Sequence, residues 1–444
     1  MTASTETGRE PSRARVDRWR TKAEVLGEVR RSPGLTRVEL ARRLSLSSAS
    51  VTETVGRLRE AGWITECRAP VQGRGRPTTC LDACPDGPRV VAVDVRHEDW
   101  RVGLAGHDGE VTDVVGARHG RDPSAVADTL RAAVAELARG HRVVAVGLAA
   151  PAPVSDDGLV RATELAWDAV DLGSVTAALG PDPVPLQVGN DATFAGVAEA
   201  RTGAAAGAGT ALYLTVEVGL GGALLLDGRP HLGAHGAAGE YGHLPFGDPA
   251  RPCPCGATGC WGPEVDGRAL ARRLGAPAPE DPRSYAEAVL TRAASGEEDA
   301  VAAVGGAAAR LARGVAGLVH VHDPDVVVLG GLARGLRASP AFDEAYERAL
   351  MAFRRADPVP VLDAVHGDLL AQLRELLPAD DRWSHRHGSP GHGRDHVLPA
   401  LVAPSMSVPV LGGALTLGTW QSVCLVDTNT DNPTRKVRLS LLAA

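Results

Sequence analysis

Between residues 90 and 331, apolar runs typical of strands alternate with segments of helical periodicity, and this alternation restricts the possible fold more than any other feature. Amphipathic helices are expected at 124–138 and 300–321. Strands that alternate with helices predict an α/β domain built of layered sheets and helices. No segment of the sequence repeats another. The expected strands are 90–95, 101–106, 110–119, 143–151, 186–191, 210–228 as a hairpin, and 325–331.

The length and composition set the broad class of the protein. With 444 residues, the chain exceeds one ordinary domain and suits two or three. Its apolar fraction of 44%, with only 3% aromatic residues, is enough for a core of Ala, Val and Leu. The polar N-terminus lacks the apolar middle of a signal peptide, and no apolar run reaches about 18 residues. We therefore expect a cytoplasmic protein without a membrane span.

The first 80 residues differ from the rest of the chain in charge. They carry a net charge of +7, whereas the remainder carries −14. A solvated charged surface is the ordinary explanation of such an asymmetry. A basic N-terminal part on an acidic body is also what a protein shows when only that part meets nucleic acid.

Within this basic part, the apolar residues predict three short helices and a helix-turn-helix at 35–62. The helices are expected at 21–31, 38–44 and about 49–61, and a strand is expected to begin at Trp63. Residues 73–77, Gly-Arg-Gly-Arg-Pro, would form a basic wing. A three-helix module that binds another protein fits the same pattern, but the arginines and the positive charge favour DNA. The apolar residues are Val25, Leu26, Val29, Leu40, Ala41, Leu44, Val51, Val55 and Leu58.

The candidate DNA contacts divide by chemistry. The last helix would enter the major groove, where hydroxyl groups and a carboxylate near its N-terminus read base edges. Arginines would contact phosphates, and those of the wing would enter the minor groove. The candidates are Ser48, Ser50, Thr52 and Glu53 for bases, Arg42, Arg43 and Arg57 for phosphates, and Arg74 and Arg76 for the wing.

One histidine and three of the seven cysteines are close together in the sequence: His243, Cys253, Cys255 and Cys260. Three buried thiols without a metal are the simpler interpretation of the cysteines. Cys3His is, however, a preferred ligand set for tetrahedral zinc. Because such a set leaves no coordination position for water, we expect a structural zinc that holds the loop 245–261.

Residues of about 20–355 resemble the ROK family of sugar kinases and repressors. The most specific part is 188–262, with the stretches 188–205 and 215–246 and the Cys-Pro-Cys-Gly-Ala-Thr-Gly-Cys-Trp-Gly loop at 253–262. Residues 323–333 also resemble the strand and turn near the nucleotide base in kinase members. The resemblance implies a two-lobed, actin-like fold with a sugar cleft between the lobes. It also implies that Asn190, Asp191, Glu240 and His243 contact sugar hydroxyls, and that Asp191 is the general base in kinase members. An Asn-Asp pair after a strand is also a common turn.

Two positions depart from the kinase pattern. Kinase members carry Asp-x-Gly-Gly-Thr after the first strand, whereas residues 94–99 here are Asp-Val-Arg-His-Glu-Asp. The glycines and threonine are replaced, and Glu98 and Asp99 would repel phosphate. The family also usually has Cys-Leu-Glu, whose Glu binds sugar. This chain has Cys260, Trp261 and Gly262 there, and Glu264 follows two residues later. Either Glu264 substitutes for that Glu, or the sugar site is altered.

The last eighty residues resemble a different family, the YjbQ-like proteins, also called the secondary thiamine-phosphate synthase group. Residues 403–410 and 418–421, together with His385 and His396, carry this likeness. It implies a β-rich segment that lacks the N-terminal portion of its family. The histidines 385, 387, 392 and 396 fit a polar loop better than an active site, and opportunistic metal binding is a third interpretation.

These observations predict four segments and a function. Residues 1–19 are expected to be disordered, 20–82 to form a winged helix-turn-helix, 88–358 a ROK sugar-binding domain, and 360–444 a partial YjbQ-like segment. We expect a non-enzymatic repressor of carbohydrate metabolism that binds an operator as a homodimer or homotetramer and responds to a sugar. The alternatives are a ROK sugar kinase and a thiamine-phosphate synthase-type enzyme acting through the C-terminal segment.

Overall fold

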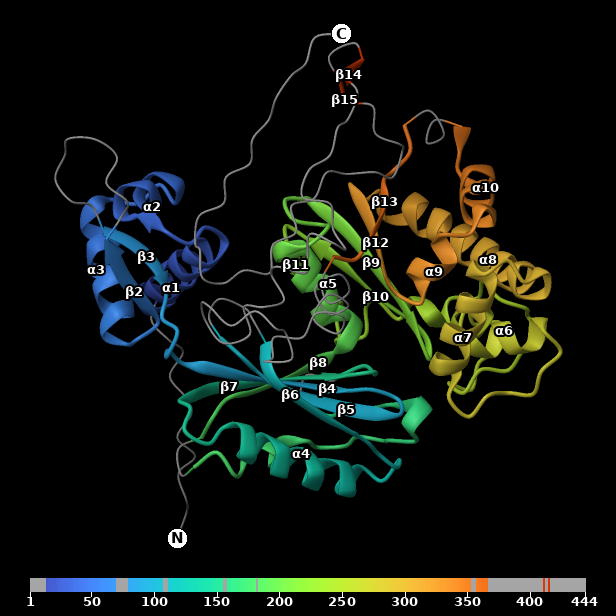
Figure 1. Cartoon of the computed structure of the whole chain (residues 1–444), viewed down its shortest axis with the longest axis horizontal. Coiled ribbons are helices and arrows are strands. Elements are labelled where there is room, and N and C mark those ends of the chain that lie inside the picture. Colours follow the sequence, from blue (N-terminus) through green and yellow to red (C-terminus); the bar gives the residue numbers. More distant parts are fainter. Residues whose placement is uncertain are drawn as a thin grey trace, which may run out of the picture. The chain divides into compact units, whose positions relative to one another are not determined.

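The computed structural model describes residues 13–68, 79–106, 111–154, 158–180, 183–352, 357–365, 410–411 and 414–415 (Figure 1). The chain divides into two compact units, Met1–Ala364 and Val365–Ala444. Of the segment expected to be disordered, 1–12 lie outside the described residues, whereas 13–19 form the start of a helix. No proline or glycine interrupts the chain between residues 13 and 26, so the helix extends further than the apolar pattern indicated.

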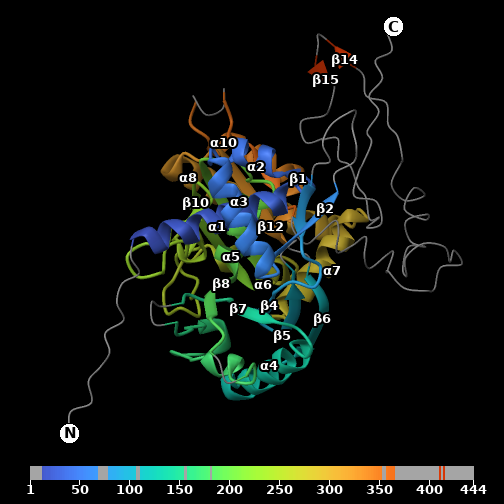
Figure 2. The same cartoon turned by 90° about the vertical axis from the view of Figure 1, so that its left-hand side faces the viewer.

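The N-terminal head is a small helical core beside a three-stranded sheet of order β1-β3-β2. Its core contains Val25, Val29, Leu40, Val51, Val55 and Leu58, as predicted, together with Ile64 and Leu81 from the strands. Figure 2 brings α1, α2 and α3 to the front of the view. The head comprises α1 (Arg13–Arg31), β1 (Leu35–Thr36), α2 (Arg37–Arg43), α3 (Ser48–Glu60), β2 (Ile64–Arg68) and β3 (Thr79–Ala83).

Side-chain caps fix where the two helices of the helix-turn-helix begin. Thr36 and Glu39 form a capping box at the start of α2, because each side chain accepts from the other residue's backbone N–H. Ser47 caps α3 by accepting from the backbone N–H of Ser50 at 3.1 Å. The short turn between these helices therefore ends at a defined residue, and it fixes which side chains start the second helix.

The first lobe is a five-stranded sheet of order β6-β5-β4-β7-β8 with α4 against one face (Figure 1). Val126, Leu130 and Val134 of α4 are fully or almost fully buried against the strands. The lobe comprises β4 (Arg89–Val95), β5 (Asp99–Ala105), β6 (Val111–Arg118), α4 (Pro123–Leu137), β7 (Val143–Ala150), the 3-10 turns η1 (Thr163–Leu165) and η2 (Gly173–Thr176), and β8 (Leu186–Asn190).

The second lobe has a sheet of order β11-β10-β9-β12-β13. Helices cover both of its faces: α5 on one, and a group that includes α8 and α10 on the other. The lobe comprises α5 (Asp191–Thr202), β9 (Thr210–Glu217), β10 (Gly219–Leu226), β11 (Arg229–Pro230), η3 (Tyr241–His243), η4 (Gly262–Glu264), α6 (Gly267–Arg273), α7 (Pro282–Ala294), α8 (Glu298–His322), β12 (Val326–Gly331), α9 (Ala333–Arg337), α10 (Pro340–Ala349) and β13 (Val361–Asp363).

The two sheets share one topology. In each, three antiparallel strands come first (β4 to β6, and β9 to β11), and a helical crossover then adds a parallel strand beside the first one. A last parallel strand, β8 or β13, completes the sheet. This two-lobed arrangement is the actin-like α/β fold that the sequence predicted, and it repeats without any visible repeat in the sequence.

Alternation along β9 explains why this strand is apolar throughout. Leu212, Leu214 and Val216 are buried on the face covered by α8, whereas Ala211 and Tyr213 belong to the core formed with α5. Helix α8 is long and apolar enough to cross a membrane by length and composition. Its buried face forms the centre of this lobe's core, which accounts for that composition.

The structure extends the second sheet beyond residue 358, where the sequence-based boundary lies. Strand β13 pairs in parallel with β12, with Val327 opposite Val361. In the second compact unit, the described residues form a short antiparallel pair, β14 (Val410–Leu411) and β15 (Ala414–Leu415). The candidate histidines 385, 387, 392 and 396 lie outside the described residues.

Candidate functional site

The junction of β8 and α5 presents the first two candidate sugar ligands. Asn190 ends the strand and caps the helix, because its Oδ1 accepts from the backbone N–H of Thr193 at 2.9 Å. Its Nδ2 donates to the Ala152 carbonyl at 3.3 Å. Asn190 is therefore held by the backbone on both sides, and it fixes the position of Asp191 at the first turn of α5.

Asp191 lies among other acidic residues. Burial raises the pKa of its carboxyl group to about 7, a hydrogen bond from the backbone N–H of Ala192 opposes this, and the charges of Asp94, Glu217 and Glu240 raise it further. Burial also raises the pKa of Glu240. Asp191 and Glu240, both predicted from the sequence, thus belong to one electrostatic cluster. Asp94 and Glu217 are members that the sequence analysis did not assign to the site.

His243 links the acidic cluster to the cysteines. Its Nε2 lies 3.8 Å from Glu240 Oε2, and its Nδ1 lies 3.8 Å from Cys253 Sγ. The two ring nitrogens therefore face different groups. This geometry allows His243 to serve a metal through Nδ1 while Nε2 faces Glu240 and a ligand in the cleft.

The four predicted metal ligands come together in space. The ligand atoms of His243, Cys253, Cys255 and Cys260 all lie within 4.8 Å of one another. The sulfur atoms of Cys255 and Cys260 are 3.7 Å apart, and sulfurs bound at about 2.3 Å in a tetrahedron are separated by about 3.8 Å. The donor set and its spacing fit a structural zinc. The cluster can hold a metal, and we treat the zinc itself as a proposal.

The backbone of the loop brings the cysteines together. The Cys253 carbonyl accepts from the backbone N–H of Gly256 at 2.9 Å, and Cys253 N–H donates to the Ala257 carbonyl at 2.8 Å. Gly256 has φ +92°, in the left-handed region that favours glycine. This tight turn places Cys253 and Cys255 on one side of the loop, opposite Cys260.

Trp261 gives the loop an apolar anchor that the sequence analysis underestimated. Its side chain is fully buried against α8, and its Nε1 donates to the Arg310 carbonyl at 3.2 Å. The ring also packs against Phe246, with 5.7 Å between ring centroids. This aromatic contact therefore joins the two ends of the loop that carries the cysteines.

Glu264, the remaining candidate sugar ligand, has a different partner. Its buried carboxylate accepts from Arg251 Nε at 2.5 Å. Glu264 is not among the acidic groups that raise the pKa of Asp191. Asp191 thus follows Asn190, the charge of Glu240 acts on Asp191, and His243 lies beside Glu240, whereas the described partner of Glu264 is Arg251.

An ion pair closes the turn between β4 and β5, where the sequence departs from the kinase pattern. Arg96 donates from Nε and Nη2 to the two carboxylate oxygens of Asp99, at 2.6 and 2.5 Å. Although burial opposes it, these hydrogen bonds and the Arg96 charge hold the pKa of Asp99 below its usual value. His97 Nδ1 lies 2.6 Å from Glu98. Side chains in this turn therefore pair with one another, whereas a phosphate-binding turn presents free backbone N–H groups.

In the head, the predicted base-contacting residues lie along one accessible side of α3. Ser48, Thr52 and Glu53 are exposed, and Ser50 is half-buried. Two of the predicted phosphate ligands already have partners: Arg57 pairs with Glu53 at 2.5 Å, and Arg43 pairs with Glu28 at 2.8 Å. Arg42 is exposed. The wing arginines Arg74 and Arg76 lie outside the described residues.

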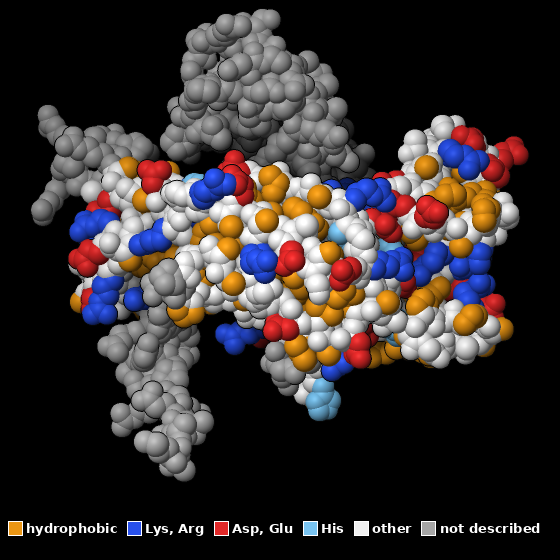
Figure 3. All heavy atoms as spheres, turned by 90° about the horizontal axis from the view of Figure 1, so that it is seen from below, with side chains coloured by type: hydrophobic (Ala, Val, Ile, Leu, Met, Phe, Trp, Pro, Cys, Tyr) orange, Lys and Arg blue, Asp and Glu red, His pale blue; other side chains and the backbone are white. Residues whose placement is uncertain are grey.

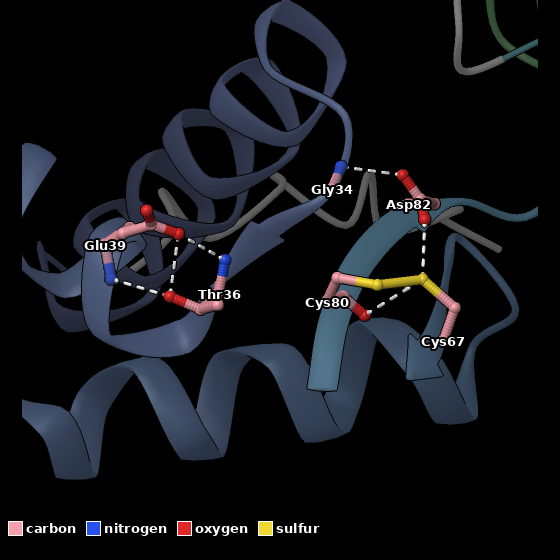
Figure 4. The surroundings of a disulfide bond; sticks show 6 residues. All are labelled: Gly34, Thr36, Glu39, Cys67, Cys80 and Asp82. Atoms are coloured by element: carbon pink, nitrogen blue, oxygen red, sulfur yellow. Dashed lines mark hydrogen bonds between the residues drawn. A yellow bond between two sulfur atoms is a disulfide. The ribbon is translucent and has the colours of Figure 1, made fainter. Parts of the chain in front are cut away.

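A disulfide joins Cys67 of β2 to Cys80 of β3, the strands on either side of the wing (Figure 4). The two residues are direct partners in the antiparallel register. Asp82 accepts from the backbone N–H of Gly34 beside this pair at 2.8 Å. This pairing was not predicted from the sequence, although the two cysteines lie on either side of the predicted wing.

Comparisons with known proteins identify the parts of the chain. The ROK family model matches residues 90–373. The chain belongs to the ROK family. The MarR family model matches residues 20–75, which include α2, α3 and β2 of the head. The model of the UPF0047 protein YjbQ-like family matches residues 361–444. The ROK and YjbQ-like families are those predicted from the sequence. The MarR match agrees with the predicted winged helix-turn-helix.

Individual relatives agree with this division. A UPF0047 protein of Mycobacterium bovis is 64% identical over 75 residues, and the chain spans about 58% of that protein's length. The match covers 17% of this chain. The xylose repressor of Caldicellulosiruptor bescii is 23% identical over 319 residues, or 67% of this chain and 79% of that protein. A solved ROK family transcriptional regulator, a homologue of the E. coli MLC protein, superposes with a TM-score of 0.65. The superposition covers 78% of this chain and 92% of that regulator, with 22% sequence identity.

Proposed function

We propose that this ROK protein is a cytoplasmic, DNA-binding transcriptional repressor of carbohydrate metabolism that responds to a sugar or sugar derivative. The observation that carries the proposal is the combination of a winged head, whose α3 presents exposed polar residues, with a two-lobed ROK body. A winged helix-turn-helix uses such a helix to read the major groove. Two similar proteins, a xylose repressor and a transcriptional regulator, support this function.

The acidic cluster supports a polyhydroxylated ligand. Asp191, Glu240 and Asn190 offer oxygen acceptors and an amide at the edge of the second lobe. The carboxyl groups and the amide suit the hydroxyl groups that a sugar supplies in number, and the acidic groups disfavour an anion. A neutral sugar would therefore enter here, with His243 Nε2 beside Glu240.

The turn after β4 supports a sensor rather than a catalyst. Phosphoryl transfer depends on donors that position phosphates, whereas Arg96 is bound by Asp99, and Glu98 adds another negative charge. A structural zinc at His243, Cys253, Cys255 and Cys260 would keep the sugar-facing imidazole in place. Sugar binding would change the arrangement of the lobes, and a homodimer or homotetramer would transmit this change to two heads on an operator.

The test begins by mapping the genomic sites that the purified full-length protein binds. Fluorescence anisotropy on a site found in this way then measures DNA affinity across a panel of neutral sugars and sugar phosphates. Arg42→Ala is expected to weaken binding uniformly across sequences and to reduce the salt slope by about 1. The matched control is Arg121→Ala, an exposed arginine of the first lobe. Binding that does not depend on DNA sequence would contradict the proposed repressor function. A DNA affinity that no sugar changes would contradict the proposed response to a sugar.

A second candidate function, an ATP-dependent sugar kinase, has one observation in its favour. The pKa of Asp191 is raised to about 7, which suits a general base near neutral pH. Phosphorylation of glucose or N-acetylglucosamine that disappears in Asp191→Asn would establish it. The third candidate, an enzyme of the thiamine-phosphate synthase type in the C-terminal segment, requires activity that survives deletion of residues 1–355.

A further inference from the structure

A hollow of about 450 Å³ lies on the second lobe, between two helices and the loop 245–261, here called the metal loop. Residues 247–251 of the loop form one wall, and Glu264, α6 and α8 form the others. Its volume falls within the range of small-molecule pockets. The acidic cluster around Asp191 contributes no residue to its lining. The hollow is therefore a separate feature of the lobe.

Four arginines line this hollow: Arg251 from the metal loop, Arg272 and Arg273 from α6, and Arg310 from α8. Only Asp248 and Glu264 contribute negative charge to the lining. Figure 3 shows Lys and Arg side chains, interspersed with Asp and Glu, on the right of the view, the side on which Figure 1 draws α6, α7 and α8. The lining of the hollow thus carries an excess of positive charge.

The four guanidinium groups differ in their hydrogen-bond and ion-pair partners. Arg251 pairs with Glu264 at 2.5 Å and with Asp248 at 3.6 Å. Arg272 donates to the Pro263 carbonyl. Arg273 and Arg310 have no hydrogen-bond or ion-pair acceptor for their side chains among the described residues, although Glu264 and Arg310 influence Arg273 electrostatically. Two guanidinium groups with free donors therefore face one hollow from adjacent helices.

The arginines of the hollow influence one another electrostatically. Burial lowers the pKa of Arg272, and the charge of Arg251 lowers it further. Burial also lowers the pKa of Arg273; Glu264 opposes this, and Arg310 adds to it. Arg272, Arg273 and Arg310 are exposed, so solvent screens their mutual repulsion, and the remaining cost in free energy is one that a bound anion would offset.

We propose that this hollow binds a phosphorylated small metabolite, with Arg273 and Arg310 as the principal ligands of its phosphate group. Guanidinium groups bind phosphate oxygens with paired, charge-assisted hydrogen bonds. A bare phosphate would leave much of the 450 Å³ unfilled, so the remaining space suits the organic part of a phosphate ester. This site is independent of the proposed sugar cleft, and it would let the protein sense a phosphorylated compound in addition to a neutral sugar.

The position of the hollow gives the ligand a route to the rest of the lobe. Arg272 and Arg268 lie one turn apart on α6, and Arg268 pairs with Glu164 of the first lobe at 2.9 Å. Arg251 lies two residues before the metal ligand Cys253. An anion that draws the arginines together would therefore act on the metal loop and on the helix that contacts the first lobe.

Isothermal titration calorimetry on the full-length protein tests the proposal with glucose 6-phosphate, inorganic phosphate, sulfate and glucose as probes. Glucose 6-phosphate is expected to bind saturably, and Arg273→Gln/Arg310→Gln to weaken it by about tenfold or more, since hydrogen bonds between charged groups are lost. Arg313→Gln is the matched control, because Arg313 is exposed on the same helix and does not line the hollow. It should stay within about twofold of the wild type.

Further arms separate this site from the sugar cleft and from general anion binding. Asp191→Asn should retain glucose 6-phosphate binding, because the acidic cluster lies outside the hollow. Arg310→Gln alone, at a side chain exposed on α8, provides a variant with little effect on folding and should weaken binding by several-fold. Absence of saturable binding would overturn the proposal. Equal affinity for sulfate, inorganic phosphate and the ester would overturn it too, as would loss of binding in Asp191→Asn but not in Arg273→Gln/Arg310→Gln.

Discussion

Arg268 of the second lobe donates from Nη1 to the carboxylate of Glu164 in the first lobe at 2.9 Å. The same guanidinium group pairs at 2.6 Å with Asp266, whose side chain is fully buried. Asp266 also caps α6 by accepting from the backbone N–H groups of Arg268 and Ala269. Because Asp266 fixes Arg268 on its own lobe, Glu164 is the partner that a separation of the lobes would release.

We expect Glu164→Gln to favour separation of the lobes. Both side chains are partly exposed, so loss of the charge should lower the free energy of unfolding by only about 1 kcal/mol. Urea denaturation measures that change, and small-angle X-ray scattering should show a larger radius of gyration. Glu280→Gln, at an exposed position, is the control. Identical scattering from the two variants would show that the pair does not hold the lobes together.

Removal of the metal should destabilise the second lobe. Cys260→Ser leaves three ligands, so we expect a loss of metal by mass spectrometry and a lower melting temperature. Structural zinc sites contribute free energy of order 10 kcal/mol in the smallest domains, and we expect a fraction of that here because Trp261 anchors the loop independently. Cys84→Ser is the control, since this free thiol is not part of the cluster. A chelator with no effect on either measurement would argue for metal-free thiols.

Protonation of Asp191 should make stability depend on pH. Its pKa is raised from 3.8 to about 7, mainly by burial, so between these values the unfolded chain releases a proton that the folded protein retains. Folding then becomes less favourable as the pH rises from about 4 to about 7, and the cost is constant above that.

Asp191→Asn removes this cost. We expect the variant to gain stability relative to the wild type over the same pH range, and to differ from it least below about pH 4. Chemical denaturation at a series of pH values measures the difference. Asp86→Asn, whose side chain is exposed, should show no such trend. A difference that is independent of pH would mean that Asp191 is ionised throughout.

The disulfide in the head should stabilise the wing. It closes a sequence separation of 13 residues, for which chain entropy predicts about 3 kcal/mol at most. Reduction, or Cys80→Ser, should therefore increase hydrogen exchange in β2 and β3. DNA affinity should fall with it, because the predicted wing arginines lie between these two strands in the sequence. If exchange in β3 is the same in the reduced and oxidised proteins, the disulfide has no such role.

Local patterns predicted most of the fold. Val51, Val55 and Leu58 lie in the core of the head because helical spacing places them on one face of α3. The four metal ligands converge because a short loop with Gly256 at a positive φ cannot keep them apart. In these regions the contacts are between residues close together in the sequence, so the sequence was sufficient to predict them.

Long-range partners could not be predicted in the same way. Glu264 is a candidate sugar ligand by its position after Cys260, but its carboxylate pairs with Arg251 across the loop. Asp94 and Glu217 belong to different lobes and join the cluster around Asp191 only after the strands have assembled. The cavity arginines likewise come from a loop and two helices separated by as many as 59 residues, Arg251 to Arg310. Such groupings depend on tertiary packing, which periodicity and spacing do not encode.

Two glycines of α8 provide a final test of the packing around the metal loop. A methyl group on Gly314 would lie 2.1 Å from the buried ring of Trp261, whereas one on Gly305 would meet its nearest neighbour, Ala341, at 3.6 Å. Alanine favours helix over glycine by about 1 kcal/mol, so Gly305→Ala should stabilise the protein by up to that amount. Gly314→Ala should instead destabilise it by about 1–3 kcal/mol, because Trp261 is fully buried and cannot move aside freely. Urea denaturation of the two variants compares the same substitution on the same helix. A stabilising effect at Gly314 would mean that Trp261 can leave its place on α8, and that metal ligation alone holds the loop.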